Sequence, residues 1–189
     1  RSAIADAGKM IPKDGEEGAL GPEGRMLQRR KTKKLEVGPG LLKKTGSKPN
    51  LWAAAAKAAC DYALHVIVTD PAEPHASADL AECLANGISS LKVYMTYDAL
   101  KLNDEELLDV LVLCRTHGAM VMVHAESHEL ISWITRRLLA AERVAAKFHA
   151  VARPVLAERE AAHRAITFAE FIGTPLLIVH VSSGAAAEE

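Results

Sequence analysis

Four short apolar runs recur along the chain from residue 62 onward, with stretches of helical spacing between them. The runs span residues 62–68, 89–95, 119–124 and 175–181. A short apolar run bounded by turn-forming residues is typical of a buried strand. The intervening stretches indicate helices over about 77–86, from Asn103 to Gly118, over about 127–142 and over about 157–172. The pattern therefore predicts the order β-α-β-α-β-α-β.

Several of the predicted helices have recognisable ends. Asn103 is a good N-cap, and Glu106 three residues later completes a capping-box pattern. A glycine follows three of the helical stretches, where glycine commonly ends a helix: Gly87, Gly118 and Gly173. We also expect a helix over Leu51–Ala59, an irregular stretch over 145–156 that contains Pro154, and a further helix from Gly184.

Strands that alternate with helices of this length imply right-handed crossovers and a parallel sheet. A closed (β/α)₈ barrel needs about 250 residues, whereas this chain has 189. Four strands are too few to close a barrel by themselves. The pattern thus predicts an α/β fold that is either a small open sheet or part of a barrel.

The first 50 residues have a different character. They carry 12 Lys and Arg against 6 Asp and Glu, a net charge of +6, whereas the rest of the chain has a net charge of −7. They also hold 8 of the 12 glycines. A segment of this composition buries too little apolar surface to offset its ordering entropy. We expect residues 1–50 to be a low-complexity basic leader, disordered or foreign to the fold, and residues 51–189 to form the folded part.

Within this leader, the run 29–34 (Arg-Arg-Lys-Thr-Lys-Lys) is a candidate nucleic-acid patch. No aromatic residues are interleaved with it for base stacking, so a solvated charge run is the favoured interpretation. A nucleic-acid partner is therefore not favoured, and a nucleic-acid binder that works through the basic leader is kept as a weaker alternative.

Composition also bears on where the protein works. No apolar stretch reaches the roughly 18 residues of a membrane helix, so no membrane partner is expected. The three cysteines, Cys60, Cys83 and Cys114, are odd in number and widely spaced. This pattern is typical of reduced, partly buried thiols, and we expect a cytoplasmic protein.

Two histidines, His124 and His180, each end an apolar run. The ends of strands in a parallel α/β sheet are where the sheet opens to its ligands. Lys92 lies inside a third run, where an isolated ammonium is costly unless it has a partner or a chemical task. Lys92 and His124 are 32 residues apart, about one βα unit, and the 56 residues from His124 to His180 make one lengthened unit.

This combination suggests a metal site on a barrel rim. Neutral imidazole is a common zinc ligand, and a neutral lysine amine can take up CO₂ as a carbamate, which can bridge two cations. A paired metal site activates water for hydrolysis, and the hydroxyl of Tyr97 could donate to an oxyanion. Structural interpretations also exist, because a strand-end histidine can be a hydrogen-bonded core residue and a strand lysine can extend to solvent.

The remaining histidines are expected to be structural or solvent-facing. His65 lies in the middle of the first predicted strand and is assigned a structural role. Those on loops or helices are expected to face solvent: His75, His117, His128, His149 and His163. His149 is the candidate exception, because its loop could border a site.

Six blocks of the chain together resemble the dihydropyrimidinases and D-hydantoinases, which are cyclic-amide hydrolases of the amidohydrolase superfamily. The blocks are residues 62–67, 87–97 (Gly-Ile-Ser-Ser-Leu-Lys-Val-Tyr-Met-Thr-Tyr), 121–126 (Val-Met-Val-His-Ala-Glu), 150–154, 158–165 and 178–183. The resemblance covers about residues 51–189, with the lysine block and both histidine blocks in the family's order and spacing.

The resemblance implies a site and a fold. Lys92 would be a carboxylated lysine that bridges two Zn²⁺ ions per full-length subunit, and His124 and His180 would be ligands of one of these ions. Tyr97 would bind substrate and stabilise the developing oxyanion, so Tyr97 and Lys92 are the expected catalytic residues. The loop 98–103 resembles one that shapes substrate preference. The family fold is a TIM-type (β/α)₈ barrel of the metal-dependent hydrolases, of which this chain would hold about four βα units, and the family assembles as a homotetramer.

The implied activity is hydrolytic opening of dihydropyrimidines or 5-substituted hydantoins to N-carbamoyl amino acids, so the expected partner is a small cyclic ureide or amide. The family's first-strand His-x-His pair has no match, because residues 1–50 contain no histidine, and the late aspartate would lie beyond Glu189. We therefore expect a truncated or mis-assembled product, or a fragment, that holds three of six metal-binding residues and is inactive alone.

Two kinds of alternative stay open. Some relatives keep the fold, lose the metal ligands and serve as cytoskeletal assembly proteins, but the presence of Lys92, His124 and His180 favours the enzyme. Allantoinases and dihydroorotases are related enzymes, and the block 92–97 (Lys-Val-Tyr-Met-Thr-Tyr) favours dihydropyrimidinase by resemblance.

Overall fold

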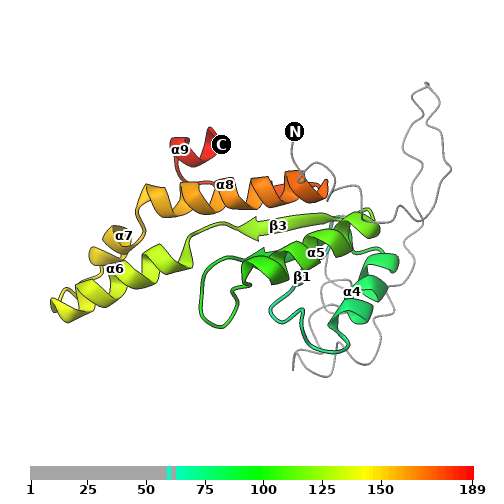
Figure 1. Ribbon diagram of the computed structural model, residues 1–189, viewed down its shortest axis with the longest axis horizontal. Helices are drawn as coiled ribbons and strands as arrows, with labels where there is room; N and C mark the ends of the chain where they lie inside the picture. Colours follow the sequence, from blue (N-terminus) through cyan, green and yellow to red (C-terminus); the bar gives the residue numbers. More distant parts are fainter. Residues whose placement is uncertain (1–58, 61–62) are drawn as a thin grey trace, which may run out of the picture. The chain divides into compact units, whose positions relative to one another are not determined.

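The computed structural model describes residues 59–60 and 63–189 (Figure 1). The predicted leader over 1–50 and most of the predicted helix over 51–59 lie outside the described residues. The elements alternate as predicted: β1 (Val66–Ile67), α4 (Ala76–Ala85), β2 (Ser90–Tyr94), α5 (Asp104–Thr116), β3 (Met120–His124), α6 (His128–Ala140), α7 (Phe148–Ala152), α8 (Val155–Ile172), β4 (Leu176–Ile178) and α9 (Gly184–Ala187).

The four strands form one sheet in the order β1-β2-β3-β4, and every neighbouring pair is parallel. The parallel sheet predicted from the alternating pattern is therefore confirmed. Its register aligns one residue from each strand in a row across the sheet: Ile67, Lys92, Met122 and Leu177. Because side chains alternate between the two faces of a strand, the residues of this row share one face.

The opposite face of the sheet is the centre of the core. Leu91 and Val93 of β2 and Val121 and Val123 of β3 have no exposed surface. They belong to one cluster with the apolar sides of α5 and α8, which run alongside β3 in Figure 1. α8 contributes mainly alanines to this cluster, and their small side chains let the helix approach the sheet closely. A buried hydrogen bond links α5 to the segment just before β4: the Thr174 hydroxyl donates to the Leu111 carbonyl over 2.9 Å.

The face that carries Lys92 is only partly covered by the described residues. Ile67 and Leu177 are 54% and 42% exposed, and Lys92 and Met122 are half-buried. The apolar runs alone do not reveal this difference between the faces. It matters for function, because Lys92, Tyr94 and His124 all lie on the less covered face.

Local signals at the helix ends are confirmed. Asn103 caps α5: its side-chain oxygen accepts from the Glu106 backbone N–H, and the Glu106 carboxylate accepts from the Asn103 backbone N–H. Gly118 and Gly173 follow α5 and α8 with φ of 65° and 78°, a left-handed conformation that glycine adopts without steric penalty.

Replacing Asn103 by alanine is expected to lower the free energy of unfolding by about 0.5–2 kcal/mol, because the first turn of α5 loses its side-chain acceptor. Ser127 is the matched control: it precedes α6 at the same position, but its side chain makes no capping hydrogen bond. Urea denaturation of Asn103→Ala and Ser127→Ala measures the difference. Equal losses in the two variants would contradict a specific capping role for Asn103.

Three details differ from the sequence-based predictions. The stretch 145–156 was expected to be irregular, but it contains α7, and α8 already begins at Val155. The last strand is shorter than predicted and ends at Ile178, so His180 lies two residues beyond it. His65 lies just before the two-residue β1 rather than in mid-strand, where it forms a hydrogen bond with the Ser90 hydroxyl, in keeping with its structural assignment.

All three cysteines are free thiols: Cys60 is exposed, and Cys83 and Cys114 are buried. Burial raises the pKa of Cys83 and raises that of Cys114 to about 12, so both buried thiols stay protonated at neutral pH. None of the helices in the described ranges is both long enough and apolar enough to cross a membrane.

Candidate active site

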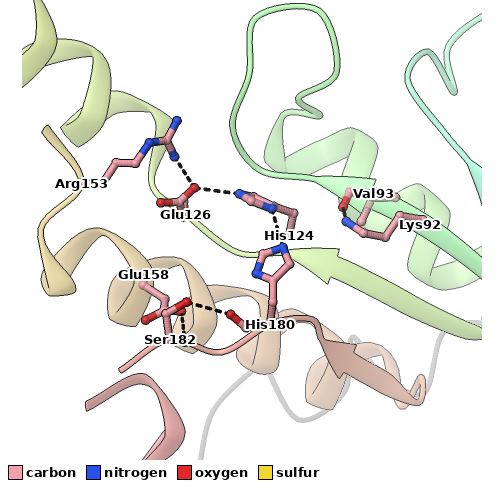
Figure 2. Close-up of polar contacts among 8 residues, drawn as sticks. All are labelled: Lys92, Val93, His124, Glu126, Arg153, Glu158, His180 and Ser182. Atoms are coloured by element: carbon pink, nitrogen blue, oxygen red, sulfur yellow. Dashed lines mark hydrogen bonds and ion pairs between the residues drawn. The ribbon is translucent and has the colours of Figure 1, made fainter. Parts of the chain in front are cut away.

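The two predicted histidines meet at one end of the sheet (Figure 2). His124 is the last residue of β3 and is 8% exposed, and His180 follows the neighbouring β4. The Nδ1 atom of His124 lies 2.9 Å from Nε2 of His180. The two rings pack edge to face, with centroids 4.6 Å apart. The parallel pairing of β3 with β4 thus brings together two imidazoles that are 56 residues apart in sequence.

This pair has the geometry of two ligands that could share one ion. Zn–N bonds of about 2.0–2.1 Å in a tetrahedral site separate two ligand nitrogens by about 3.3 Å. The observed 2.9 Å is close to that value and requires only a small opening of the rings. Within residues 59–60 and 63–189, no group of three or more His, Cys, Asp and Glu side chains is arranged for a metal ion. A metal site here therefore requires a donor of another kind or residues outside the described part.

Lys92 lies on the same sheet face, two residues before Tyr94. Its ammonium donates to the Val93 carbonyl over 2.9 Å and lies 3.7 Å from the centre of the Tyr94 ring. The Tyr94 ring in turn stacks on His124, with centroids 5.6 Å apart. Burial lowers the pKa of Lys92 to about 8, which increases the fraction of uncharged amine at neutral pH.

Tyr97 is the third predicted site residue that lies with the histidine pair. Its ring centroid is 5.0 Å from that of His124. The loop behind it is held in two ways: the backbone N–H groups of Leu100 and Lys101 donate to the Tyr97 carbonyl, and Lys101 pairs with Glu129 of α6 at 3.6 Å. The phenol is 39% exposed and so stays accessible to a small molecule.

Backbone strain is concentrated at these residues. Among the described non-glycine residues, only Tyr97, Glu142 and His180 have positive φ, with values of 74°, 57° and 42°. Such conformations cost roughly 1–3 kcal/mol each and persist where the surrounding structure requires them, often at functional sites. Two of the three belong to the cluster around His124, which supports its assignment as a site independently of residue type.

Glu126 and Arg153 complete the cluster. The Glu126 carboxylate accepts from Nε2 of His124 over 2.7 Å and also pairs with the Arg153 guanidinium (Figure 2). Burial by itself raises the pKa of Glu126, but the hydrogen bonds from His124 and Arg153 bring it below its usual value. Burial also lowers the pKa of His124, against the opposing effect of Glu126. At neutral pH the cluster thus holds a charged carboxylate beside a neutral imidazole.

A cavity of about 370 Å³ opens beside the cluster. Its walls come from the loop after β2, the end of β3, α7, the start of α8 and the segment after β4. The residues that line it include Tyr97, His124, Glu126, Arg153, Glu158 and His180. His149, whose segment was expected to border a site, also lines this cavity. Lys92 does not line the cavity, because its ammonium turns toward the Val93 carbonyl.

No role was predicted from the sequence for Glu126, Arg153 or Glu158. Glu158 accepts from the Ser182 backbone N–H and the Ser183 hydroxyl, each over 2.6 Å, and so holds the segment just after His180. All three residues lie within the blocks that carried the family resemblance, which was the available signal. His128 was expected to face solvent, but its side chain is mostly covered and contacts Ser132 at 3.1 Å and Asp98 at 3.5 Å.

No protein-family model matches the chain. Among curated proteins, the D-hydantoinase of Ralstonia pickettii is 36% identical over 138 residues, which are 72% of this chain and 30% of that protein. The dihydropyrimidinase of Rattus norvegicus is 35% identical over 133 residues, which are 70% of this chain and 26% of that protein. The chain thus spans less than a third of the length of these curated relatives.

Solved structures give the same result. A crystal structure of a D-hydantoinase matches with a TM-score of 0.67 and 35% identity, over 72% of this chain and 30% of that one. The dihydropyrimidinase of Brevibacillus agri matches with a TM-score of 0.66 and 37% identity, over 75% of this chain and 33% of that one. The four parallel strands and their helices therefore correspond to part of a TIM-type (β/α)₈ barrel, as the resemblance implied.

Proposed function

Since the described part of this chain belongs to the D-hydantoinase and dihydropyrimidinase family, we propose that the chain is part of a hydrolase that opens cyclic amides. The substrates are dihydropyrimidines or 5-substituted hydantoins. The ring C–N bond breaks, the oxygen of water joins the carbonyl carbon, and its two protons go to the released amine and the new carboxyl group or solvent. The product is an N-carbamoyl amino acid.

The observation that carries this proposal is the convergence of His124 Nδ1 and His180 Nε2 at a cavity bordered by Tyr97. In the proposed centre these two nitrogens hold one of two zinc ions. When bound, zinc polarises the amide carbonyl and lowers the pKa of water. The separation of the two nitrogens supports this role. Among the described residues that line the cavity, Arg153 is the one Lys or Arg side chain, and Glu126 neutralises its charge, so no unpaired Lys or Arg there would repel a metal ion.

Lys92 is proposed to provide the bridging ligand as a carbamate. Its uncharged amine adds to CO₂, a proton leaves the nitrogen, and the lysine ends in a carboxylate. The lowered pKa of Lys92 supports this step, because only the uncharged amine reacts. The flexible side chain must give up one partly buried hydrogen bond, to the Val93 carbonyl, to present that carboxylate on the face shared with His124.

Tyr97 is proposed to donate its hydroxyl to the carbonyl oxygen of the substrate as negative charge develops there. Its contact with His124 and its exposed phenol support this role. A cavity of about 370 Å³ lies within the usual range for small-molecule sites and suits one small cyclic amide.

We also propose that the parent enzyme is a homo-oligomer. α6 buries only Ile131 among its 13 residues, while Trp133 and Leu139 are 50% and 56% exposed. Exposed apolar side chains gathered on one element are typical of a protein–protein contact.

A segment exchange tests the proposed function. Residues 63–189 of this chain would replace the matching segment of the Geobacillus stearothermophilus D-hydantoinase, which is 35% identical over 142 residues. The exchange enzyme is expected to open a 5-substituted hydantoin, because the substituted segment would provide Lys92, Tyr97, His124 and His180. Chromatography of the N-carbamoyl product measures the reaction.

The unmodified recipient enzyme is the reference for activity, and circular dichroism with gel filtration verifies that the exchange enzyme folds. A folded exchange enzyme that contains the recipient's amount of zinc but forms no N-carbamoyl product would contradict the proposed function.

A further inference from the structure

Glu126 makes its contact with His124 on the side of the ring opposite the candidate metal position. The carboxylate binds Nε2 of His124 at 2.7 Å, whereas Nδ1 faces His180. A carboxylate can only accept hydrogen bonds. The proton of the His124 ring must therefore be on Nε2 for this contact to form, and Nδ1 is left as the lone pair that faces His180.

The Glu126 carboxylate is itself held in place by the fold. Arg153, between α7 and α8, forms an ion pair with the same Oε2 atom that binds His124. Both side chains are largely buried, with exposed fractions of 18% for Glu126 and 21% for Arg153. Arg153 also lies 5.4 Å from the centre of the Tyr97 ring, so one guanidinium touches both the carboxylate and the aromatic residue of the site.

We propose that Glu126, held by Arg153, is a positioning residue that fixes His124 in the Nε2–H tautomer and so presents Nδ1 to a metal ion. This inference rests on the proposed function for the identity of the ion, but the tautomer itself is a property of the metal-free chain. Partners of this kind, on the second ring nitrogen of a ligating histidine, fix ring orientation and tune metal affinity.

The same geometry implies that His180, unlike His124, changes its tautomer when zinc binds. In the metal-free chain His124 Nδ1 accepts, so Nε2 of His180 must donate across the 2.9 Å contact. An ion bound between the two rings needs a lone pair from each of them. The proton of His180 must then move from Nε2 to Nδ1 when zinc binds, while the tautomer of His124 stays unchanged.

The test measures tautomers and zinc affinity in the full 189-residue chain with ¹⁵N-labelled histidine. In the metal-free chain, NMR is expected to show the His124 signal with its proton on Nε2, assigned by its disappearance in His124→Gln. Glu126→Ala is expected to lose this single tautomer and to bind zinc about 10–100-fold more weakly. Glu126→Gln keeps an acceptor oxygen without the charge and is expected to fall between the two.

Glu158→Ala is the control for the His124 tautomer. It removes another carboxylate from the wall of the same cavity, but one that binds Ser182 and Ser183 rather than His124. The proton of His124 is expected to stay on Nε2 in this variant, even where release of the segment after His180 alters the chemical shift of Nδ1. Arg153→Gln is the second variant, expected to weaken the tautomer preference without removing the carboxylate.

An unchanged His124 tautomer in Glu126→Ala, a doubly protonated His124 in the unsubstituted chain, or equal zinc affinities of Glu126→Ala and the unsubstituted chain would each overturn the inference. Failure of the proposed metal centre gives a different result: the unsubstituted chain then binds no zinc. In that case the metal-free NMR spectra still decide whether Glu126 fixes the His124 ring.

Discussion

Replacing His180 by glutamine is expected to reduce the affinity of the chain for zinc by about 100-fold or more. Loss of a partner that only orients a ligand already costs about 10–100-fold, and His180 is proposed to provide a ligand nitrogen directly. Its Nε2 atom lies 2.9 Å from His124 Nδ1, so the substitution removes one of the two nitrogens that are proposed to hold the ion. A hundred-fold loss corresponds to about 2.8 kcal/mol of binding free energy.

Competition of the 189-residue chain with a chromogenic zinc chelator measures this affinity. His117→Gln is the matched control, because it makes the same chemical change at an exposed histidine after α5, away from the cavity. The control is expected to bind zinc like the unsubstituted chain. Similar losses in both variants would show that the zinc is held at scattered histidines and not between His124 and His180.

The order of elements and the helix ends could be predicted because they depend on neighbours in sequence. The capping box of α5 needs only Asn103 and Glu106 at a spacing of three. Gly118 and Gly173 mark helix ends because the backbone there has a positive φ, which glycine adopts readily. Alternation of strands and helices then implies a parallel sheet, which places the ends of β3 and β4 side by side. The meeting of His124 with His180 followed from that topology.

The end of β4 could not be predicted in the same way. Val179 and Val181 make the apolar run look like a longer strand, and the Val179 N–H still donates to the Val123 carbonyl. The strand nevertheless ends at Ile178, and φ becomes +42° two residues later, at His180. A run of apolar residues does not show where the backbone turns, because hydrophobicity carries no signal for the positive φ that His180 adopts.

Which charged residues pair with each other could also not be predicted from the sequence. Glu126 and Arg153 are 27 residues apart, with α6 and α7 between them. The chain offers many carboxylates and guanidinium groups, and this pair lies at the ends of two helices, α6 and α7, that pack against each other. Likewise, the apolar run that contains Lys92 did not show that its face of the sheet is less covered than the opposite one.

Replacing Leu111 by alanine is expected to lower the free energy of unfolding by about 2–5 kcal/mol. Leu111 of α5 has no exposed surface and belongs to the cluster that joins the helices to Leu91, Val93, Val121 and Val123 of the sheet. The substitution removes buried methyl groups and leaves a cavity that the surrounding strands and α8 cannot fully close. The backbone carbonyl of residue 111 still accepts from Thr174, so the effect comes from lost packing.

Leu139→Ala is the matched control, because Leu139 lies on α6 with 56% of its surface exposed. The chemical change and the change in helix propensity are the same, so the control is expected to alter stability by less than about 0.5 kcal/mol. Urea denaturation followed by circular dichroism measures both variants. A larger loss in Leu139→Ala than in Leu111→Ala would mean that α6, rather than the interface of α5 with the sheet, carries the packing that sustains the fold. The ends of β3 and β4, and with them the His124–His180 contact, would then depend on the helix that borders the cavity instead of on the core behind the sheet.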